Sequence, residues 1–109
     1  MTDFTRNTCP MKFEISEKAF EDIENIWLYT MENWSSDQAD RYYNLIFDEI
    51  EYIAENPLSG RNAGHIRKNY RCSLVKSHLI YYRYKKQEKK VEIIRILHQS
   101  MDAEERLKG

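Results

Sequence analysis

Val91-Glu92-Ile93-Ile94-Arg95-Ile96-Leu97-His98 is the stretch of this 109-residue sequence that decides the fold. Its aliphatic side chains leave little polar surface on either face of an extended chain. A strand of this composition is typically buried on both sides. We therefore expect residues 91–97 to form a central, well-buried strand with the other elements arranged around it.

Two more β-rich runs, residues 70–75 and 79–84, precede this strand and are separated by short polar segments. Short connections produce hairpins, so the three runs predict an antiparallel meander. Residues 11–15 alternate apolar and polar side chains and predict a first strand. Residues 57–69 contain glycine, asparagine and basic residues and indicate a loop.

Two amphipathic helices are predicted between the first strand and the meander. After Ser16, a good helix N-cap, apolar residues recur at steps of three and four over about residues 17–33. Ser35 and Gln38 match a capping box, so a second helix begins near residue 36 and ends at Asn56-Pro57. Very few residues join the helices, which favours an antiparallel hairpin. The side chains expected to be buried are Ile23, Trp27, Ile46, Ile50, Ile94 and Ile96.

The predicted fold class is α+β: strand-helix-helix-three strands, with the helical hairpin packed on an antiparallel sheet. Residues 11–109 are expected to form one domain, and residues 1–10 a flexible extension. The polar tail, residues 99–109, is expected to be loose, with a short helix over residues 103–107, and its removal to cost little stability. The alternative is that Leu107 packs back on the sheet.

Composition excludes several classes of protein. At 41% hydrophobic and 13% aromatic residues, the chain is not of the disordered class. No apolar run approaches the roughly 20 residues of a membrane helix, and no leader-like segment is recognised, so a cytoplasmic location and no membrane partner are expected. Cys9 and Cys72 have no metal-type or redox spacing and are expected to be free thiols. Cys72, on a strand, is interpreted as a small core residue.

Charge is divided unevenly along the chain. Residues 1–56 contain 13 acidic and four basic residues, whereas residues 57–109 contain five acidic and 13 basic ones. The net charges of −9 and +8 predict an acidic and a basic surface. The basic half could contact a nucleic acid or an acidic protein, or the two halves could simply complement each other within one fold.

No phosphate loop, dinucleotide fingerprint or HExxH motif is present, and the three histidines have no metal-site spacing. We expect neither a cofactor nor a metal. Phosphodiester cleavage remains conceivable because Arg71, Arg83 and Arg95 lie on successive strands and His98 ends the last. On one face they would form a phosphate-binding array with an acid. The alternative pairs these arginines with Glu92 and the acidic helices, and a shift of one residue in register decides between the two.

Aromatic residues offer two further possibilities. Tyr81, Tyr82 and Tyr84 flank Arg83 and are either base-stacking residues on a sheet surface or half-buried packing residues. Trp34, at the end of the first helix, is expected to be partly exposed and could anchor a partner.

In several blocks the chain resembles the ParE branch of the RelE/ParE toxins of bacterial toxin–antitoxin pairs. The resemblance covers about residues 11–107, and the last block is the strongest. The blocks are Ala19-x-x-Asp22-Ile23-x-x-Ile26, Trp34-Ser35-x-x-Gln38-Ala39, Asn56-Pro57-x-x-Gly60, Tyr70-Arg71, Ser77-His78-Leu79-Ile80-x-Tyr82-Arg83 and Val91-Glu92-Ile93-Ile94-Arg95-Ile96-Leu97-His98-Gln99-Ser100-Met101-Asp102.

The resemblance implies a plasmid-stabilisation type of toxin that inhibits DNA gyrase, through its A subunit, and is neutralised by a ParD-like antitoxin that folds as it binds. Such a toxin is not an enzyme and binds no nucleic acid sequence-specifically. RelE-type relatives instead cut messenger RNA on the ribosome; in that case Arg71, Arg83, Arg95 and His98 would be the catalytic candidates. A non-toxic interaction module is the third reading. Partner contacts are expected at Trp34, Tyr81, His98, Met101 and Leu107.

Overall fold

The computed structural model describes residues 13–107, which form one mixed sheet and three helices. In chain order these are β1 (Phe13–Ile15), α1 (Glu17–Asn33), α2 (Ser36–Glu55), β2 (Arg61–Asn62), β3 (Tyr70–Val75), β4 (His78–Lys85), β5 (Lys90–His98) and α3 (Ala103–Arg106). The expected extension over residues 1–10 lies outside the described residues. None of the described helices is long and apolar enough to cross a membrane.

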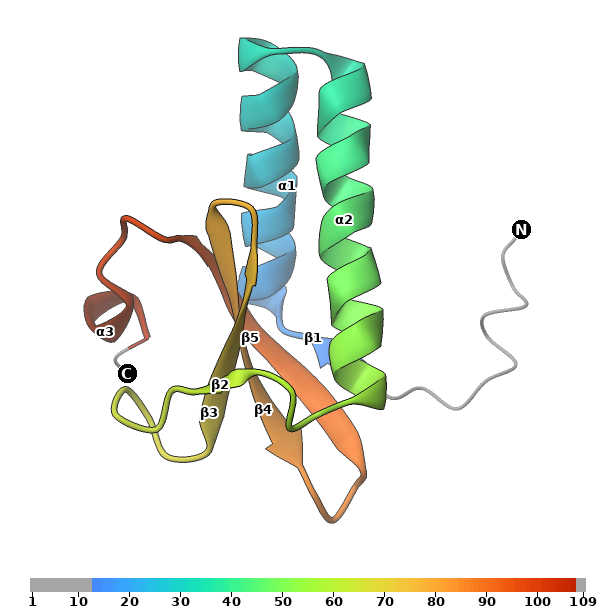
Figure 1. Ribbon diagram of the computed structural model, residues 1–109. Coiled ribbons are helices and arrows are strands. Elements are labelled where there is room, and N and C mark those ends of the chain that lie inside the picture. The colour runs from blue at the N-terminus through green and yellow to red at the C-terminus, as the bar shows by residue number, and fades with distance from the viewer. Residues whose placement is uncertain (1–12, 108–109) are drawn as a thin grey trace.

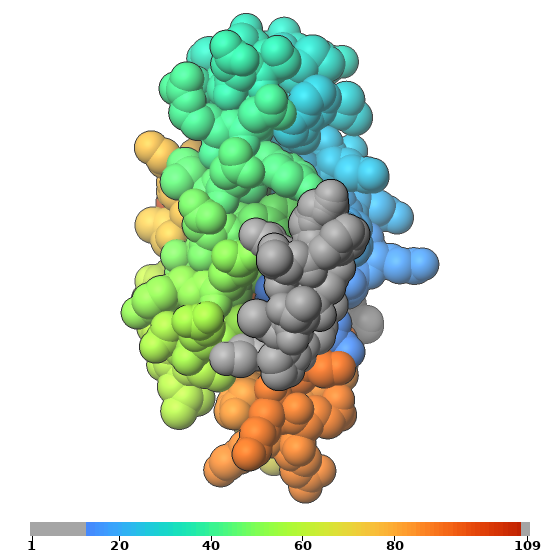
Figure 2. All heavy atoms as spheres, turned by 90° about the vertical axis from the view of Figure 1, so that its right-hand side faces the viewer, coloured from blue at the N-terminus to red at the C-terminus, as the bar shows by residue number. Residues whose placement is uncertain are grey.

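The α+β fold class is confirmed, but the sheet is mixed and not antiparallel throughout as expected. The strand order is β1-β5-β4-β3-β2, and β3, β4 and β5 form the antiparallel meander. The sheet is mixed because β1 runs parallel to β5, with Phe13 opposite Val91 and Ile15 opposite Ile93. Helices α1 and α2 cover one face, and their far ends project beyond the sheet (Figure 1). The β4–β5 hairpin, orange in Figure 2, forms the opposite end of the molecule.

Helix boundaries follow the local signals. The Ser16 hydroxyl accepts a hydrogen bond from the Ala19 N–H at 3.0 Å, and the Ser35 hydroxyl accepts one from the Gln38 N–H at 3.1 Å. Each satisfies one of the backbone donors that a helix N-terminus leaves unpaired. The predicted helix bounds are therefore confirmed. The two-residue strand β2 lies in the segment expected to be a loop, because two polar residues carry no alternation that a sequence pattern could reveal.

A bulge changes which residues of β5 face the helices. Tyr81 lies opposite Arg95 and Tyr82 lies opposite Ile93, so Ile94 has no direct partner. The extra residue changes which positions face the helices. Consequently Ile93 and Ile96 both belong to the core beneath α1 and α2, although an unbroken strand would place them on opposite faces.

A second, smaller core lies on the other face of the sheet. Its buried residues are Ala63, Cys72, Tyr81, Leu97 and Leu107, with Ile94 and Ala103 packed against them. Of the six side chains expected to be buried, four are; Ile94 and Trp27 are half-buried. Trp27 remains near the surface, where its indole N–H donates to the Asp40 carboxylate at 3.0 Å and joins the two helices.

The tail returns to the sheet instead of hanging loose. Leu107 is only 6% exposed in the second core, and the Arg67 guanidinium donates to its carbonyl oxygen. The expectation of a loose, dispensable tail is therefore wrong, and the alternative, in which Leu107 packs back on the sheet, is the arrangement observed. One apolar residue in a polar segment is a weak sequence signal, but here it belongs to the same buried cluster as Tyr81 and Leu97.

Asp22 connects α1 to the edge of β5 that β1 is too short to cover. Its carboxylate accepts from Arg95 Nε at 2.8 Å, from Arg95 Nη2 at 3.0 Å and from the Ile96 backbone N–H at 2.9 Å. At the preceding residues of β5, Ser16 donates through its N–H to the Ile93 carbonyl and through its hydroxyl to the Ile94 carbonyl. Backbone N–H and carbonyl groups along this edge of β5 thus find hydrogen-bond partners in Ser16 and in Asp22 of α1.

We expect Asp22→Ala to lower the free energy of unfolding by about 3 kcal/mol, because it leaves a mostly buried guanidinium and a backbone N–H without an acceptor. Urea denaturation measures the change. Glu24→Ala, at an exposed position of the same helix, is the control and should stay within about 0.5 kcal/mol of the parent chain. Equal effects of the two substitutions would contradict a structural role for Asp22.

We expect Leu107→Ala to lower the free energy of unfolding by about 2 kcal/mol, since it opens a cavity in the second core. Leu58→Ala is the matched control because Leu58 is 66% exposed, and it should have almost no effect. Thermal melts of both variants test this. A Leu107→Ala variant that melts like the parent chain would restore the reading of a dispensable tail.

Candidate functional site

Two histidines meet at the ends of β4 and β5, close to the turn between β3 and β4. His78 pairs with His98 across the strands, and their rings lie 5.2 Å apart in an edge-to-face arrangement. The Tyr42 hydroxyl of α2 lies 2.6 Å from His78 Nδ1 and donates to the Val75 carbonyl at 3.0 Å. That hydroxyl has one proton, so when it donates to Val75, His78 Nδ1 is the donor to the Tyr42 oxygen.

His98 has a different neighbourhood from His78. Its Nδ1 accepts from the Ser100 N–H at 3.1 Å and lies 2.7 Å from the Ser100 hydroxyl. A neutral His98 therefore carries its proton on Nε2. The ring is half-buried, and the exposed residues Ser100 and Met101 follow it directly. This end of the sheet thus presents an imidazole beside a short, accessible turn.

Burial governs the electrostatics of the pair. Desolvation, and to a smaller extent the neighbouring His98, lowers the pKa of His78 from 6.5 to about 4, while the charge of Asp22 opposes the shift. Desolvation also raises the pKa of Tyr42. His78 is accordingly neutral at physiological pH.

The three candidate arginines are held apart. Arg71 donates to the carbonyl oxygens of Gly60, at 2.8 Å, and Leu58. Arg83 pairs with Glu92 at 2.7 Å, and Arg95 binds Asp22 of the acidic helix α1. The phosphate-binding array that a common face would have produced is not assembled. For Arg83 and Arg95, the pairing with Glu92 and the helices is the arrangement observed.

Two of the three tyrosines are structural. Tyr81 is buried in the second core and Tyr82 in the first, while Tyr84 is half-buried. The Tyr82 hydroxyl donates to the Pro57 carbonyl and accepts from the Gly60 N–H, both at 2.9 Å, so it fixes the turn after α2. A Cβ at Gly60 would lie 2.8 Å from the Cys72 carbonyl oxygen, which explains the glycine in this turn.

The residues expected to contact a partner divide into two groups. Trp34, which caps α1 at the projecting end of the helices, is 68% exposed, and Met101 is 41% exposed. His98 is half-buried. Tyr81 and Leu107, at 4% and 6% exposure, pack within the chain and present little side-chain surface.

The helical hairpin exposes several large apolar side chains, in line with the expectation that Trp34 and the hairpin offer a surface to a partner. Its two helices also carry eleven acidic and only two basic residues, so the hairpin is strongly acidic. A surface of this kind is a typical site for a protein partner. The large apolar residues exposed there are Phe20, Leu28, Tyr29, Trp34, Tyr43, Leu45 and Tyr52.

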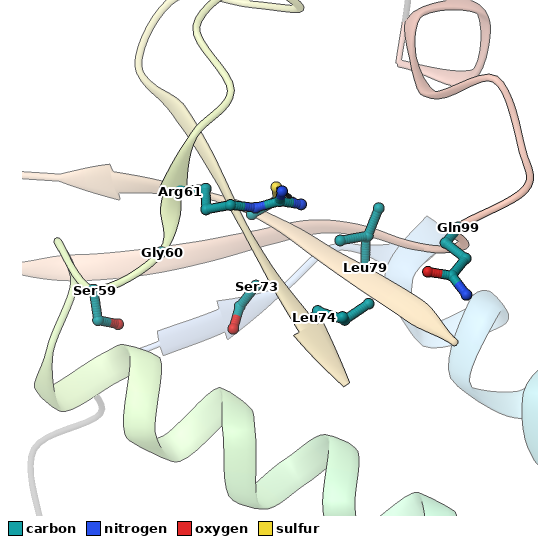
Figure 3. A pocket seen from close by; sticks show the side chains of 8 residues that line it. Ser59, Gly60, Arg61, Ser73, Leu74, Leu79 and Gln99 are labelled. Carbon is teal, nitrogen blue, oxygen red and sulfur yellow. Dashed lines mark hydrogen bonds between the residues drawn. The ribbon is translucent and has the colours of Figure 1, made fainter. Parts of the chain in front are cut away.

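A pocket of about 480 Å³ lies on the sheet between the turn after α2 and the start of β4 (Figure 3). The Arg61 side chain extends along it, with Nη2 3.8 Å from Cys72 Sγ, and Leu74, Leu79 and Gln99 line its other end.

Cys72 is buried, as the interpretation of a core residue requires. Among residues 13–107, no three metal-ligating side chains come together.

Comparison with known proteins assigns the chain to a family. Residues 13–103 match the family described as the ParE toxin of the type II toxin–antitoxin system parDE. The chain belongs to the ParE toxin family. It is similar to Toxin ParE1 of Caulobacter vibrioides, with 38% identity over 84% of this chain and 92% of that one. Toxin ParE1 of Mycobacterium tuberculosis is 34% identical over 88% of this chain and 97% of the other.

A solved structure, titled as the chromosomal ParDE TA system from P. aeruginosa, has the same fold. Its TM-score is 0.70 over 81% of this chain and 95% of that chain, at 17% identity. The resemblance to ParE toxins is thus confirmed by relatives in sequence and by a neighbour in fold. The histidine pair was the main feature that sequence reasoning missed; only the cross-strand register of β4 and β5 brings His78 to His98.

We expect this ParE chain to lose stability as pH falls. The unfolded chain takes up the His78 proton below pH 6.5, but the folded chain resists it down to about pH 4, so the loss grows across this window. His78 alone should remove about 3 kcal/mol from the free energy of unfolding. Urea denaturation at several pH values measures the loss. His78→Gln should flatten this dependence, whereas His65→Gln, in an exposed loop, should leave it unchanged.

Proposed function

We propose that this ParE toxin acts in the cytoplasm by inhibiting DNA gyrase, through the A subunit, and that a ParD-like antitoxin holds it inactive. Its membership of the ParE family is the observation that carries the proposal. On this view the chain makes or breaks no bond itself. It binds gyrase and stabilises a cleavage complex, and plasmid stabilisation follows from the toxicity.

The separation of the arginines supports a binding role. Arg71 is engaged by backbone carbonyls, Arg83 by Glu92 and Arg95 by Asp22. Catalysis of RNA cleavage would need cations and an acid–base group directed at one phosphate. Here Arg83 and Arg95 each pair with a carboxylate, so the three guanidiniums are not directed at one phosphate.

The helical hairpin supports an antitoxin as the partner. Its exposed aromatic side chains, led by Trp34, alternate with an excess of carboxylates. An antitoxin segment with apolar and basic side chains would complement both properties. Such a segment could fold on binding, gaining the buried apolar area that offsets its ordering entropy.

Ribosome-dependent RNA cleavage is the second candidate, and the histidine pair is the observation that favours it. Two imidazoles with ring centroids 5.2 Å apart, one of them beside exposed Ser100, could act as acid and base. A non-toxic interaction module is the third candidate function. Induced expression in a bacterial host would separate it from the two toxin functions, because only a toxin would arrest growth.

Purified chain should inhibit gyrase supercoiling and accumulate cleaved DNA, whereas ribosome-bound message in a parallel reaction should stay intact. His98→Ala should weaken the gyrase effect only modestly, since it removes a contact and not a proton-transfer group. An acid–base role would make the same change cost roughly 10²–10⁴ in rate. His65→Ala is the control. Cut messages, abolished in a stably folded His98→Ala chain, would replace gyrase inhibition by the nuclease function.

A further inference from the structure

A second pocket, of about 450 Å³, is lined by three cationic side chains and, as far as residues 13–107 are concerned, by no carboxylate. It lies where the loop after β2 meets the β4–β5 hairpin, at the end of the molecule where the hairpin is orange in Figure 2. Three cationic side chains line it, from the loop, from β3 and from the hairpin. The lining residues are Lys68, Arg71, Lys86, Tyr70, Tyr84, Asn62, Asn69, Leu58 and Gly64.

These cations differ from their neighbours in having no acidic partner among the described residues. On the same hairpin, Lys85 pairs with Glu14 and Glu88, and Lys90 pairs with Glu14. Within residues 13–107, no ion pair joins Lys68, Arg71 or Lys86 to a carboxylate. Positive charges gathered in one concavity repel each other, and a bound anion would offset that repulsion.

Arg71 is positioned before any ligand arrives. One of its terminal nitrogens, Nη1, donates to the carbonyls of Gly60 and Leu58, which fixes the guanidinium at the pocket wall. Its remaining N–H groups are bonded to no atom of the described chain. A guanidinium held in this way loses little side-chain entropy when it binds a planar or tetrahedral oxyanion.

The neutral groups of the wall are donors too. Neither the Tyr70 nor the Tyr84 hydroxyl has a hydrogen-bond partner in the described part of the chain. The Asn62 side-chain oxygen accepts from the Gly64 N–H at 2.7 Å, which leaves its amide N–H groups available. Donors of both kinds, charged and neutral, match a ligand that is rich in acceptors and negatively charged, and the volume is that of a small-ligand site.

We propose that this pocket binds the phosphate group of a nucleotide, with Lys68, Arg71 and Lys86 as its cationic ligands. The half-buried rings of Tyr70 and Tyr84 supply apolar wall for the nucleoside that the phosphate carries. A free nucleotide and a nucleotide of a single strand share this chemistry. The proposal goes beyond gyrase inhibition and does not depend on it.

The test is a titration of the isotope-labelled full chain followed by backbone amide shifts in NMR. Adenosine monophosphate should shift the amides of Lys68, Asn69 and Lys86 saturably, inorganic phosphate should do so more weakly, and adenosine should not. Lys68→Ala combined with Lys86→Ala should weaken nucleotide binding roughly tenfold or more, as expected when charge-assisted hydrogen bonds are lost.

The control is Lys18→Ala with Arg41→Ala, which removes the same charge from exposed helix positions and should bind like the parent chain. A single-stranded DNA oligonucleotide that binds through the same amides far more tightly than the mononucleotide would identify a strand as the natural source of the phosphate. The proposal is overturned if no phosphate ligand shifts these amides saturably, if adenosine binds as well as its monophosphate, or if both double variants weaken binding equally.

Discussion

The carboxylate of Asp22 is the point on which the arrangement of layers depends. A three-residue β1 covers only part of one edge of the nine-residue β5, and the bulge at Ile94 interrupts the regular ladder beside it. Asp22 accepts three hydrogen bonds at this place and is itself on the first turns of α1. One carboxylate therefore sets how the helical hairpin sits on the sheet, and so which apolar residues it hides and which it presents.

Local signals were sufficient for the helices and the meander, and insufficient for the site. Ser16 and Ser35 act within one turn of their own position, so a sequence pattern reveals them. The Ile94 bulge, the parallel pairing of β1 and the contact of His78 with His98 all depend on partners far along the chain. Arg71, Arg83 and Arg95 show the same limit: strand register, which no single strand encodes, decides where each guanidinium goes.

The charge division of the sequence becomes a spatial one. The acidic half contributes the helical hairpin with its exposed aromatics, and the basic half contributes the sheet with the cation-lined pocket at its far end. Membership of the ParE family accounts for a toxin with an antitoxin partner. The two surfaces differ in character, since one is acidic and apolar and the other is cationic.

Both edges of the sheet are short. At one edge, β1 and then Ser16 and Asp22 take up the hydrogen-bonding groups of β5; at the other, β2 pairs only with Arg71 and Cys72. Long straight edges are the templates on which sheets of separate molecules join and aggregate. Within the described part of this chain, a second copy finds only a brief edge on which to add a strand. The same few contacts that orient the helices thus also protect the sheet from uncontrolled growth.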